Sequence, residues 1–211
     1  TIGVENEVLN VDDVIETSNH FRCIDLIIDH AASTLSEHFI KKLNHILKTS
    51  TSDSRKDWFA VGEYKRLPNE VGGMQTSLPE EVADRMKALL SDYNAVPKKT
   101  LDDILDFHVR FERIHPFQDG NGRVGRLWHT LLLSKWNPTF AWLPVESIIH
   151  DRQQDYYNAI NASNNAGEST AFIEFMLSAI KASLIEATKM SDDMSDEKPD
   201  KKTVRLQKIE Q

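Results

Sequence analysis

The sequence predicts an all-α protein that carries one short β-hairpin. Apolar residues recur every three or four positions over most of the chain, which is typical of amphipathic helices packed on a shared core. Residues 67–79 are the exception, because two adjacent glycines separate two short segments there. A hydrophobic content of 40% in 211 residues is enough for a packed core and favours one domain with a modest appendage.

The helices follow from the apolar spacing and from residues that start or stop a helix. Thr100 and Asp103 have the spacing of a capping box, so a helix is expected over residues 101–114. Pro116 stops that helix just after His115. Further helices are expected at residues 11–16, 21–44, 79–93, 122–135, 145–161 and 169–188.

The segment 67–79 is predicted to be a small β-hairpin. Gly72-Gly73 lies between two short segments, and paired glycines of this kind are typical of a hairpin turn. An irregular loop is the alternative on these residues alone.

Charge and composition limit the classes of function. A net charge of −8 argues against a nucleic-acid surface or an anionic membrane as the main partner. The sole cysteine, Cys23, excludes a disulfide framework and favours a reducing compartment, so a cytoplasmic location is expected. No apolar run is long enough to span a bilayer, and there is no signal-peptide pattern.

Residues 115–126 read His-Pro-Phe-Gln-Asp-Gly-Asn-Gly-Arg-Val-Gly-Arg and concentrate groups that suit a polyphosphate. The glycines on either side of Asn121 allow consecutive backbone amides to face one side and form an anion-binding nest. A helix that starts near Gly122 would add its unpaired amides and the positive end of its dipole. Arg123 and Arg126 lie three residues apart, on one helical face, where both guanidinium groups can reach phosphate oxygens.

Two further residues of this segment can carry chemistry. Asp119 can coordinate magnesium, which typically takes one or two carboxylates together with substrate phosphates. His115 ends the preceding helix across the loop, and an imidazole with an ordinary pKa of about 6.5 can accept a proton from a hydroxyl near neutral pH. General-base catalysis of this kind is worth roughly 10²–10⁴-fold in rate.

Other interpretations of this segment fit less well. It lacks the Gly-Lys-[Ser/Thr] of a P-loop, and it has no glycine or glutamate where an EF-hand loop needs them. A zinc site would use four residues that lack the His-Glu-x-x-His spacing: His108, His115, Asp119 and His129. A capped helix–turn–helix with solvent-exposed arginines is the remaining structural alternative.

Residues 115–126 resemble the signature of the Fic family, His-x-Phe-x-[Asp/Glu]-Gly-Asn-Gly-Arg-x-x-Arg, and meet every fixed position. The segment Gly62-Glu63-Tyr64-Lys65-Arg66 with the following hairpin looks like the family's flap, which presents a target peptide by strand addition. The expected flap residues are Asn69, Glu70, Val71, Gly72 and Gly73. Residues 155–157 and Asn164 resemble the segment lining the adenine pocket, with Tyr157 and Asn164 as expected nucleotide contacts.

The resemblance implies the Fic fold, a helical bundle with a flap, and transfer of AMP from ATP to a Ser, Thr or Tyr hydroxyl of a target protein or of the chain itself. His115 would deprotonate the hydroxyl, and Asp119 would hold Mg²⁺ on the α- and β-phosphates. Gly122 favours AMP transfer, since a phosphorylating relative carries lysine at that point. The expected phosphate contacts are Gly120, Asn121, Gly122, Arg123 for the β-phosphate and Arg126 for the γ-phosphate.

Residues 1–6 resemble the family's inhibitory motif, [Ser/Thr]-x-x-x-Glu-[Gly/Asn]. The resemblance implies that Glu5 pairs with Arg126 and occupies the γ-phosphate site, so that ATP binds in a poor orientation. The chain then divides into residues 1–20, an N-terminal inhibitory helix region; residues 21–189, the Fic core; and residues 190–211, a charged linker or tail that could lead to a further domain. Many relatives form dimers, so a homo-oligomer is compatible with this interpretation.

Two alternative functions stay open on the sequence. The same fold could transfer another nucleotide or a phosphocholine group, or remove AMP with Glu5 positioning water. A protein of another class, a regulatory protein whose nucleotide site only senses, is the second alternative.

Overall fold

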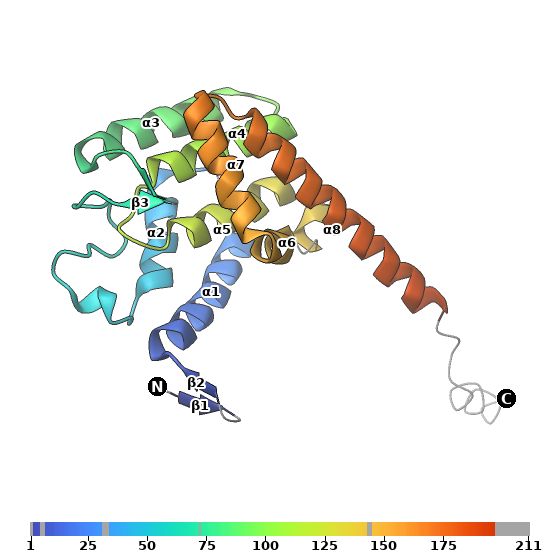
Figure 1. Ribbon diagram of the computed structural model, residues 1–211, viewed down its shortest axis with the longest axis horizontal. Helices are drawn as coiled ribbons and strands as arrows, with labels where there is room; N and C mark the ends of the chain where they lie inside the picture. The colour runs from blue at the N-terminus through green and yellow to red at the C-terminus, as the bar shows by residue number, and fades with distance from the viewer. Residues whose placement is uncertain (1, 5–6, 31–33, 72, 143–144, 197–211) are drawn as a thin grey trace.

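The computed structural model describes residues 2–4, 7–30, 34–71, 73–142 and 145–196. Over these residues the protein is mostly helical, with eight α-helices and two small antiparallel sheets of two strands each (Figure 1). The predicted class, an all-α fold with a short β-hairpin, is therefore confirmed.

The elements follow one another along the chain with short connections. The helices are α1 (Val11–Asp29), α2 (Glu37–Lys48), α3 (Pro79–Ala95), α4 (Leu101–Ile114), α5 (Asn121–Trp136), α6 (Val145–Asp151), α7 (Gln153–Ala166) and α8 (Thr170–Asp196). The strands are β1 (Ile2–Val4), β2 (Glu7–Leu9), β3 (Glu70–Val71) and β4 (Met74–Gln75), and the 3₁₀ turns are η1 (Asp53–Arg55) and η2 (Pro138–Trp142).

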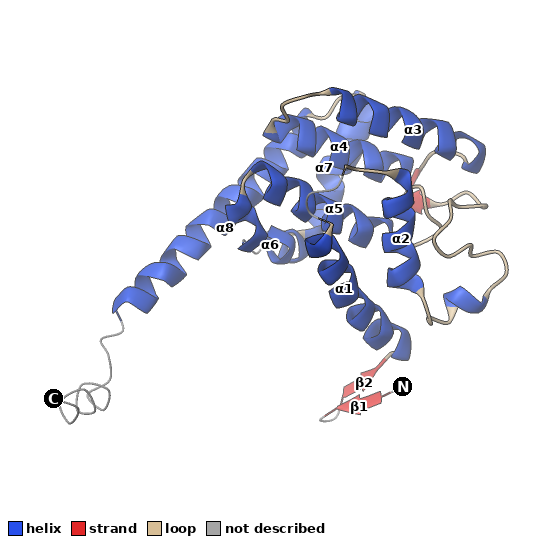
Figure 2. Ribbon diagram, turned by 180° about the vertical axis from the view of Figure 1, so that it is seen from behind, coloured by secondary structure: helices blue, strands red, loops and turns tan. Residues whose placement is uncertain are grey.

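Helices α4 and α5 form the centre of the bundle. The two helices pack against each other (Figure 2). Helix α4 is also contacted by α3, α7 and α8, and helix α5 is also contacted by α1, α2 and α6. Trp128 of α5 is fully buried and meets the ring of Phe39 from α2 at 5.3 Å between centroids. Both ends of the loop that joins α4 and α5 are therefore anchored in the core.

The predicted helix over residues 101–114 is confirmed, including both of its ends. Thr100 accepts a hydrogen bond from the amide of Asp103 at 3.2 Å, and the Asp103 carboxylate accepts one from the amide of Thr100 at 2.7 Å. This is the predicted capping box. The predicted hairpin is also confirmed, since β3 and β4 pair antiparallel.

Two other predicted helices are each divided in the structure. The helix expected over residues 21–44 is wrong, because α1 and α2 occupy that range separately. Ser36 caps α2 by accepting a hydrogen bond from the amide of Phe39 at 3.3 Å, and a capping side chain of this kind competes with helix continuation. The helix expected over residues 145–161 is divided at Arg152, between α6 and α7. Neither break contains glycine or proline, the residues that usually mark the end of a helix in a sequence. The apolar spacing continues across both breaks and therefore predicted single helices.

A small hairpin precedes the first helix. Strands β1 and β2 pair antiparallel next to the N-terminal end of α1, and the sequence analysis does not predict them (Figure 1). Helix α1 begins at Val11, as predicted, but it continues past residue 16 to Asp29. The expected boundary after residue 20 therefore falls inside one helix. Glu5, the expected inhibitory residue, lies outside the described residues.

Helix α8 is longer than the sequence predicts. It runs to Asp196, so the first part of the expected tail over residues 190–211 is helical, and its C-terminal half projects from the bundle (Figures 1 and 2). Among the described residues, no helix combines the length and the apolarity needed to cross a membrane.

Candidate active site

A cavity of about 530 Å³ opens where the loop between α4 and α5 meets the β3–β4 hairpin and α7. Its lining includes ten residues that the sequence analysis assigns to the site: Glu70, Val71, His115, Asp119, Gly120, Asn121, Gly122, Arg123, Arg126 and Tyr157. Glu112 and Gln153 also line it, and neither is expected from the sequence.

His115 is positioned by the C-terminal end of α4. Its backbone is left-handed, with φ 52°, and its amide donates to the carbonyl of Phe111 at 2.9 Å. A left-handed conformation costs a residue with a side chain roughly 1–2 kcal/mol, so the surrounding fold must hold it in place. Burial and the nearby charge of Lys65 lower the pKa of His115 to about 4, against the opposing effect of Asp119. The imidazole is therefore neutral at pH 7 and can accept a proton.

The N-terminal end of α5 forms the opposite wall of the cavity. Gly120 caps the helix with φ 82°, and a Cβ atom there would lie 3.2 Å from the Leu47 side chain, so glycine is required. The first helical hydrogen bond runs from the amide of Val124 to the carbonyl of Gly120 at 3.0 Å. The amides of residues 121–123 precede that bond and point along the helix axis, where the positive end of the dipole favours an anion.

Asn121 contributes to this wall through its backbone. Its side chain is buried, with 1% exposure, and accepts from the amide of Phe117 and donates to its carbonyl, both at 2.8 Å. The side chain therefore fixes the loop, and the backbone amide is the group left for a ligand. The helix begins at Asn121, one residue before the predicted start at Gly122.

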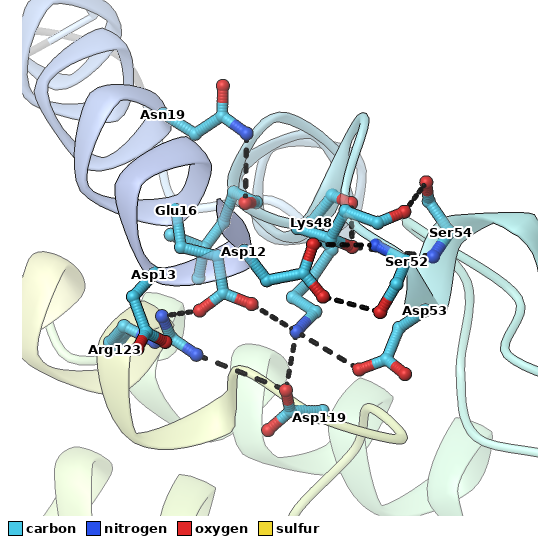
Figure 3. A network of polar contacts seen from close by, with 12 residues as sticks. Asp12, Asp13, Glu16, Asn19, Lys48, Ser52, Asp53, Ser54, Asp119 and Arg123 are labelled. Atoms are coloured by element: carbon cyan, nitrogen blue, oxygen red, sulfur yellow. Dashed lines mark hydrogen bonds and ion pairs between the residues drawn. The ribbon is translucent and has the colours of Figure 1, made fainter. Parts of the chain in front are cut away.

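Asp119 and Arg123 belong to a charge network that joins α1, α2 and α5 (Figure 3). Lys48 has 1% exposure, and its ammonium pairs with the Glu16 carboxylate and, at 2.6 Å, with Oδ2 of Asp119. Glu16 also pairs with the Arg123 guanidinium, whose Nη2 lies 3.9 Å from the same Asp119 oxygen. Asp53 is a further partner of Lys48 at 3.6 Å. The sequence analysis misses Glu16 and Lys48, which lie far from the motif along the chain.

The surroundings of Asp119 suit a magnesium ion that is held mainly by substrate phosphates. Its side chain is 49% exposed on the cavity, and its contacts with Lys48 and Arg123 both go to Oδ2. Oδ1 accepts no hydrogen bond from the described part of the chain and is the oxygen free for a cation. Within that part no three His, Cys, Asp or Glu side chains form a metal-binding group. One carboxylate plus phosphate oxygens is a common magnesium site.

Comparison with known proteins identifies the family. Residues 34–133 match the Fic/DOC family, and this range contains α4, the loop that follows it and all but the last three residues of α5. Residues 34–133 therefore form a Fic/DOC domain.

Curated relatives with Fic domains are named protein adenylyltransferases. The chain is 29% identical over 199 residues to protein adenylyltransferase fic-1 of Caenorhabditis elegans. The alignment covers 92% of this chain and 36% of that protein. It is 26% identical over 165 residues to protein adenylyltransferase Fic of Drosophila grimshawi. That alignment covers 74% of this chain and 33% of the other protein. The chain thus spans about a third of the length of the curated relatives it matches.

Solved Fic structures share the fold. A Fic family protein from Desulfovibrio desulfuricans superposes with a TM-score of 0.76 at 31% identity, over 87% of this chain and 56% of that one. Fic-1 of C. elegans superposes with a TM-score of 0.64 at 18% identity, over 90% of this chain and 56% of that one. The second likeness concerns the fold alone.

The β3–β4 hairpin of this Fic domain borders the cavity. Glu70 and Val71 of β3 line it, and Gly73 turns the hairpin with φ 79°. Asn69, also expected to dock a target, donates to the carbonyl of Phe117 at 2.9 Å. It thereby joins the hairpin to residues 115–120 between α4 and α5, the candidate catalytic loop. Gly72 lies outside the described residues.

Glu112 is a buried carboxylate of the Fic domain that the sequence analysis misses. It has 3% exposure, and its two oxygens lie 3.9 Å from the rings of His115 and His108. Burial raises the pKa of Glu112 to about 7, although the charge of Arg126 opposes this. A Cβ atom on Gly125 would lie 2.3 Å from Glu112, so the fifth residue of α5 must be glycine. The i, i+3 spacing from His115 could have revealed Glu112.

The two weaker nucleotide contacts have different surroundings. Tyr157 lines the cavity. Asn164 lies at the other end of α7, where it accepts a hydrogen bond from Arg113 at 2.6 Å, and it is not part of the described cavity lining. Its role in nucleotide binding stays a prediction. Of the zinc alternative, His108 and His129 are both buried in the core, with ring centroids 4.9 Å apart.

Proposed function

We propose that this Fic domain is a protein adenylyltransferase that transfers AMP from ATP to a Ser, Thr or Tyr hydroxyl of a target protein, and to itself. The observation that carries the proposal is one cavity with a neutral histidine on one side and a helix N-terminus with two arginines on the other. The names of the curated relatives support the same reaction.

In the proposed reaction His115 is the general base. The hydroxyl oxygen of the target bonds to the α-phosphorus while His115 accepts the hydroxyl proton. The bond from the α-phosphorus to its bridging oxygen breaks, and pyrophosphate leaves with the electron pair. Removing the proton as the new bond forms avoids a cationic oxygen in the transition state.

The phosphates would lie against α5. The amides of residues 121–123 face the α- and β-phosphates, Arg123 holds the β-phosphate, and Arg126 holds the γ-phosphate. Charge builds on these oxygens as the bond breaks, and donors fixed in advance stabilise it without reorganisation. A magnesium ion on Asp119 would add neutralisation of the phosphate charge.

The target would bind along the β3–β4 hairpin. A two-stranded hairpin has unpaired amides and carbonyls on its outer edges, and an extended peptide can add to such an edge as a further strand. Glu70 and Val71 lie on the cavity, so a strand added there would pass close to His115.

Glu5 is proposed to restrain the enzyme by pairing with Arg126. Helix α1 supports this proposal, because Glu16 in its second turn pairs with Arg123, which lies one turn before Arg126 on α5. A carboxylate on Arg126 would occupy the γ-phosphate position and repel the phosphate.

The test is intact-mass spectrometry after incubation with magnesium and ATP. The samples are the unaltered chain, Glu5→Gly, and Glu5→Gly combined with His115→Ala. A mass gain of one AMP in Glu5→Gly alone is expected. If Glu5→Gly labels neither itself nor any protein in a lysate, the adenylyltransferase proposal is wrong.

A further inference from the structure

Lys65 is a buried lysine whose ammonium contacts neutral groups. It has 3% exposure and lies between the β3–β4 hairpin and the catalytic loop. No carboxylate of the described residues lies within ion-pair distance of it. A buried charge without a counter-ion costs several kcal/mol unless its hydrogen bonds are made. The contacts of Lys65 therefore need an explanation.

The three protons of the ammonium are matched by three oxygens from three places. Nζ donates to Oδ1 of Asn69 at 2.7 Å, to Oγ1 of Thr76 at 2.6 Å and to the carbonyl of Ile114 at 3.4 Å. Asn69 immediately precedes β3, Thr76 immediately follows β4, and Ile114 is the residue before His115. One side chain thus joins both ends of the hairpin to the end of α4.

Backbone and side-chain contacts complete the same cluster. The amide of Lys65 donates to the carbonyl of Pro116 at 2.8 Å, and Asn69 donates to the carbonyl of Phe117 at 2.9 Å. Thr76 donates to the carbonyl of Asn69 at 3.0 Å, which closes the base of the hairpin. Two-residue strands are too short to keep a hairpin in place on their own. This polar cluster is what fixes the hairpin relative to the loop.

The charge of Lys65 also acts on His115. Three other ionisable groups face this pair: Glu112 with an oxygen 3.9 Å from the His115 ring, Asp119 across the loop, and Glu81 on α3 toward Lys65. After burial, Lys65 is the largest cause of the lowered pKa of His115. Burial lowers the pKa of Lys65 itself to about 8, against the effect of Glu81, so Lys65 is mainly cationic at neutral pH.

We propose that Lys65 is a positioning residue that locks the β3–β4 hairpin to the catalytic loop, so that a peptide added to the hairpin presents its hydroxyl to His115. The inference rests on the proposed adenylyl transfer for its functional meaning. The contacts with Asn69, Thr76 and Ile114 carry it. Lys65 contacts neither the N-terminal end of α5 nor the atoms that react. It acts through the hairpin and through His115.

The test compares Lys65→Met, Lys65→Arg and Thr76→Val, each in the Glu5→Gly chain, with Lys87→Met on the exposed face of α3 as the control. AMP transfer to the chain itself is measured by intact mass. Hydrogen exchange reports the amides of residues 70–75, and NMR titration reports the His115 ring.

Lys65→Met is expected to slow AMP transfer by about 10- to 100-fold, because displacing the target hydroxyl by about 1 Å from His115 lowers a catalytic rate by that order. Faster exchange in the hairpin and a rise of about one unit in the pKa of His115 should accompany it. Thr76→Val keeps the charge, so it should speed hairpin exchange and slow transfer while the His115 titration stays in place. Lys65→Arg should retain the low His115 pKa.

The affinity for magnesium ATP should change by less than about twofold in every variant, because Lys65 does not contact the N-terminal end of α5, where the phosphates are proposed to bind. A general loss of folding would instead lower this affinity. Unchanged hairpin exchange or an unchanged transfer rate in both Lys65→Met and Thr76→Val would overturn the inference. If Glu5→Gly without further changes transfers nothing, the proposed function fails, and the exchange and titration measurements still decide the role of Lys65.

Discussion

Lys48 shows how much of this site depends on single residues outside the signature. It is almost fully buried, and its ammonium joins Glu16 of α1 to Asp119 of the catalytic loop. Burying two opposite charges costs desolvation free energy, and their attraction offsets this cost only when the contacts are close and well oriented. The network therefore fixes the orientation of Asp119 and Arg123 rather than adding much stability in itself.

Removing Lys48 alone should still destabilise the fold, because it takes one partner from a buried carboxylate. In Lys48→Met, Glu16 keeps only the Arg123 guanidinium, so the free energy of unfolding should fall by about 1–3 kcal/mol. Lys56→Met, which breaks an exposed pair with Asp53, should cost less than about 1 kcal/mol. Urea denaturation at pH 7 measures both. Equal losses in the two variants would contradict the structural role of Lys48.

At the scale of elements, α4 determines where the proposed base, His115, lies. Its N-terminal end is fixed by the Thr100–Asp103 capping box, and its C-terminal end carries His115 in a left-handed conformation. The helix, its cap and its stop at Pro116 are contiguous in sequence, which is why the apolar spacing and the cap predicted all three. The break before α2 also has a local cap, Ser36, whereas Arg152 makes no side-chain cap at the start of α7.

The capping box should contribute measurably to stability. Thr100→Ala removes the side chain that accepts from Asp103 and should lower the free energy of unfolding by about 0.5–2 kcal/mol. Thr188→Ala, an exposed threonine late in α8, should stay within about 0.5 kcal/mol of the unaltered chain. Thermal or urea unfolding of both variants checks this. A loss in Thr188→Ala as large as in Thr100→Ala would argue against the cap.

For the whole molecule, buried ionisable groups set the response to acid. Burial lowers the pKa of His129 to about 4 and that of His108 well below its ordinary value, and His115 behaves like His129. The unfolded chain binds protons at these histidines below about pH 6.5. The folded chain binds these protons only at lower pH, near pH 4 for His129 and His115, so stability falls as the pH drops from about 6.5. Glu112 opposes this, since its raised pKa lets the folded state take a proton first.

The histidines outnumber the glutamate, so acid should weaken the fold. His129→Asn should make the free energy of unfolding less dependent on pH between about 6.5 and 4, by roughly 1.4 kcal/mol per pH unit. His150→Asn, which changes an exposed histidine, should leave the pH dependence as it is. Urea titrations at several pH values decide the matter. The same slope in His129→Asn as in the unaltered chain would rule out this origin.

The sequence by itself determined the helical class, the hairpin and the grouping of the proposed base with Asp119 and the two arginines. Twelve consecutive residues hold those groups, so a helix stop, a loop and a helix start are enough to bring them together. Local geometry decides such contiguous features, and local geometry is what apolar spacing and capping patterns report.

Only the tertiary structure decided the surroundings of that motif. Glu16, Lys48 and Lys65 come from three distant segments, and a lysine in a sequence is ordinarily an exposed residue. The inward turn of the Asn121 side chain and the engagement of Asn69 by the loop also depend on packing. Long-range burial has no local pattern, because it is fixed by which helices meet and not by the residues next to each side chain.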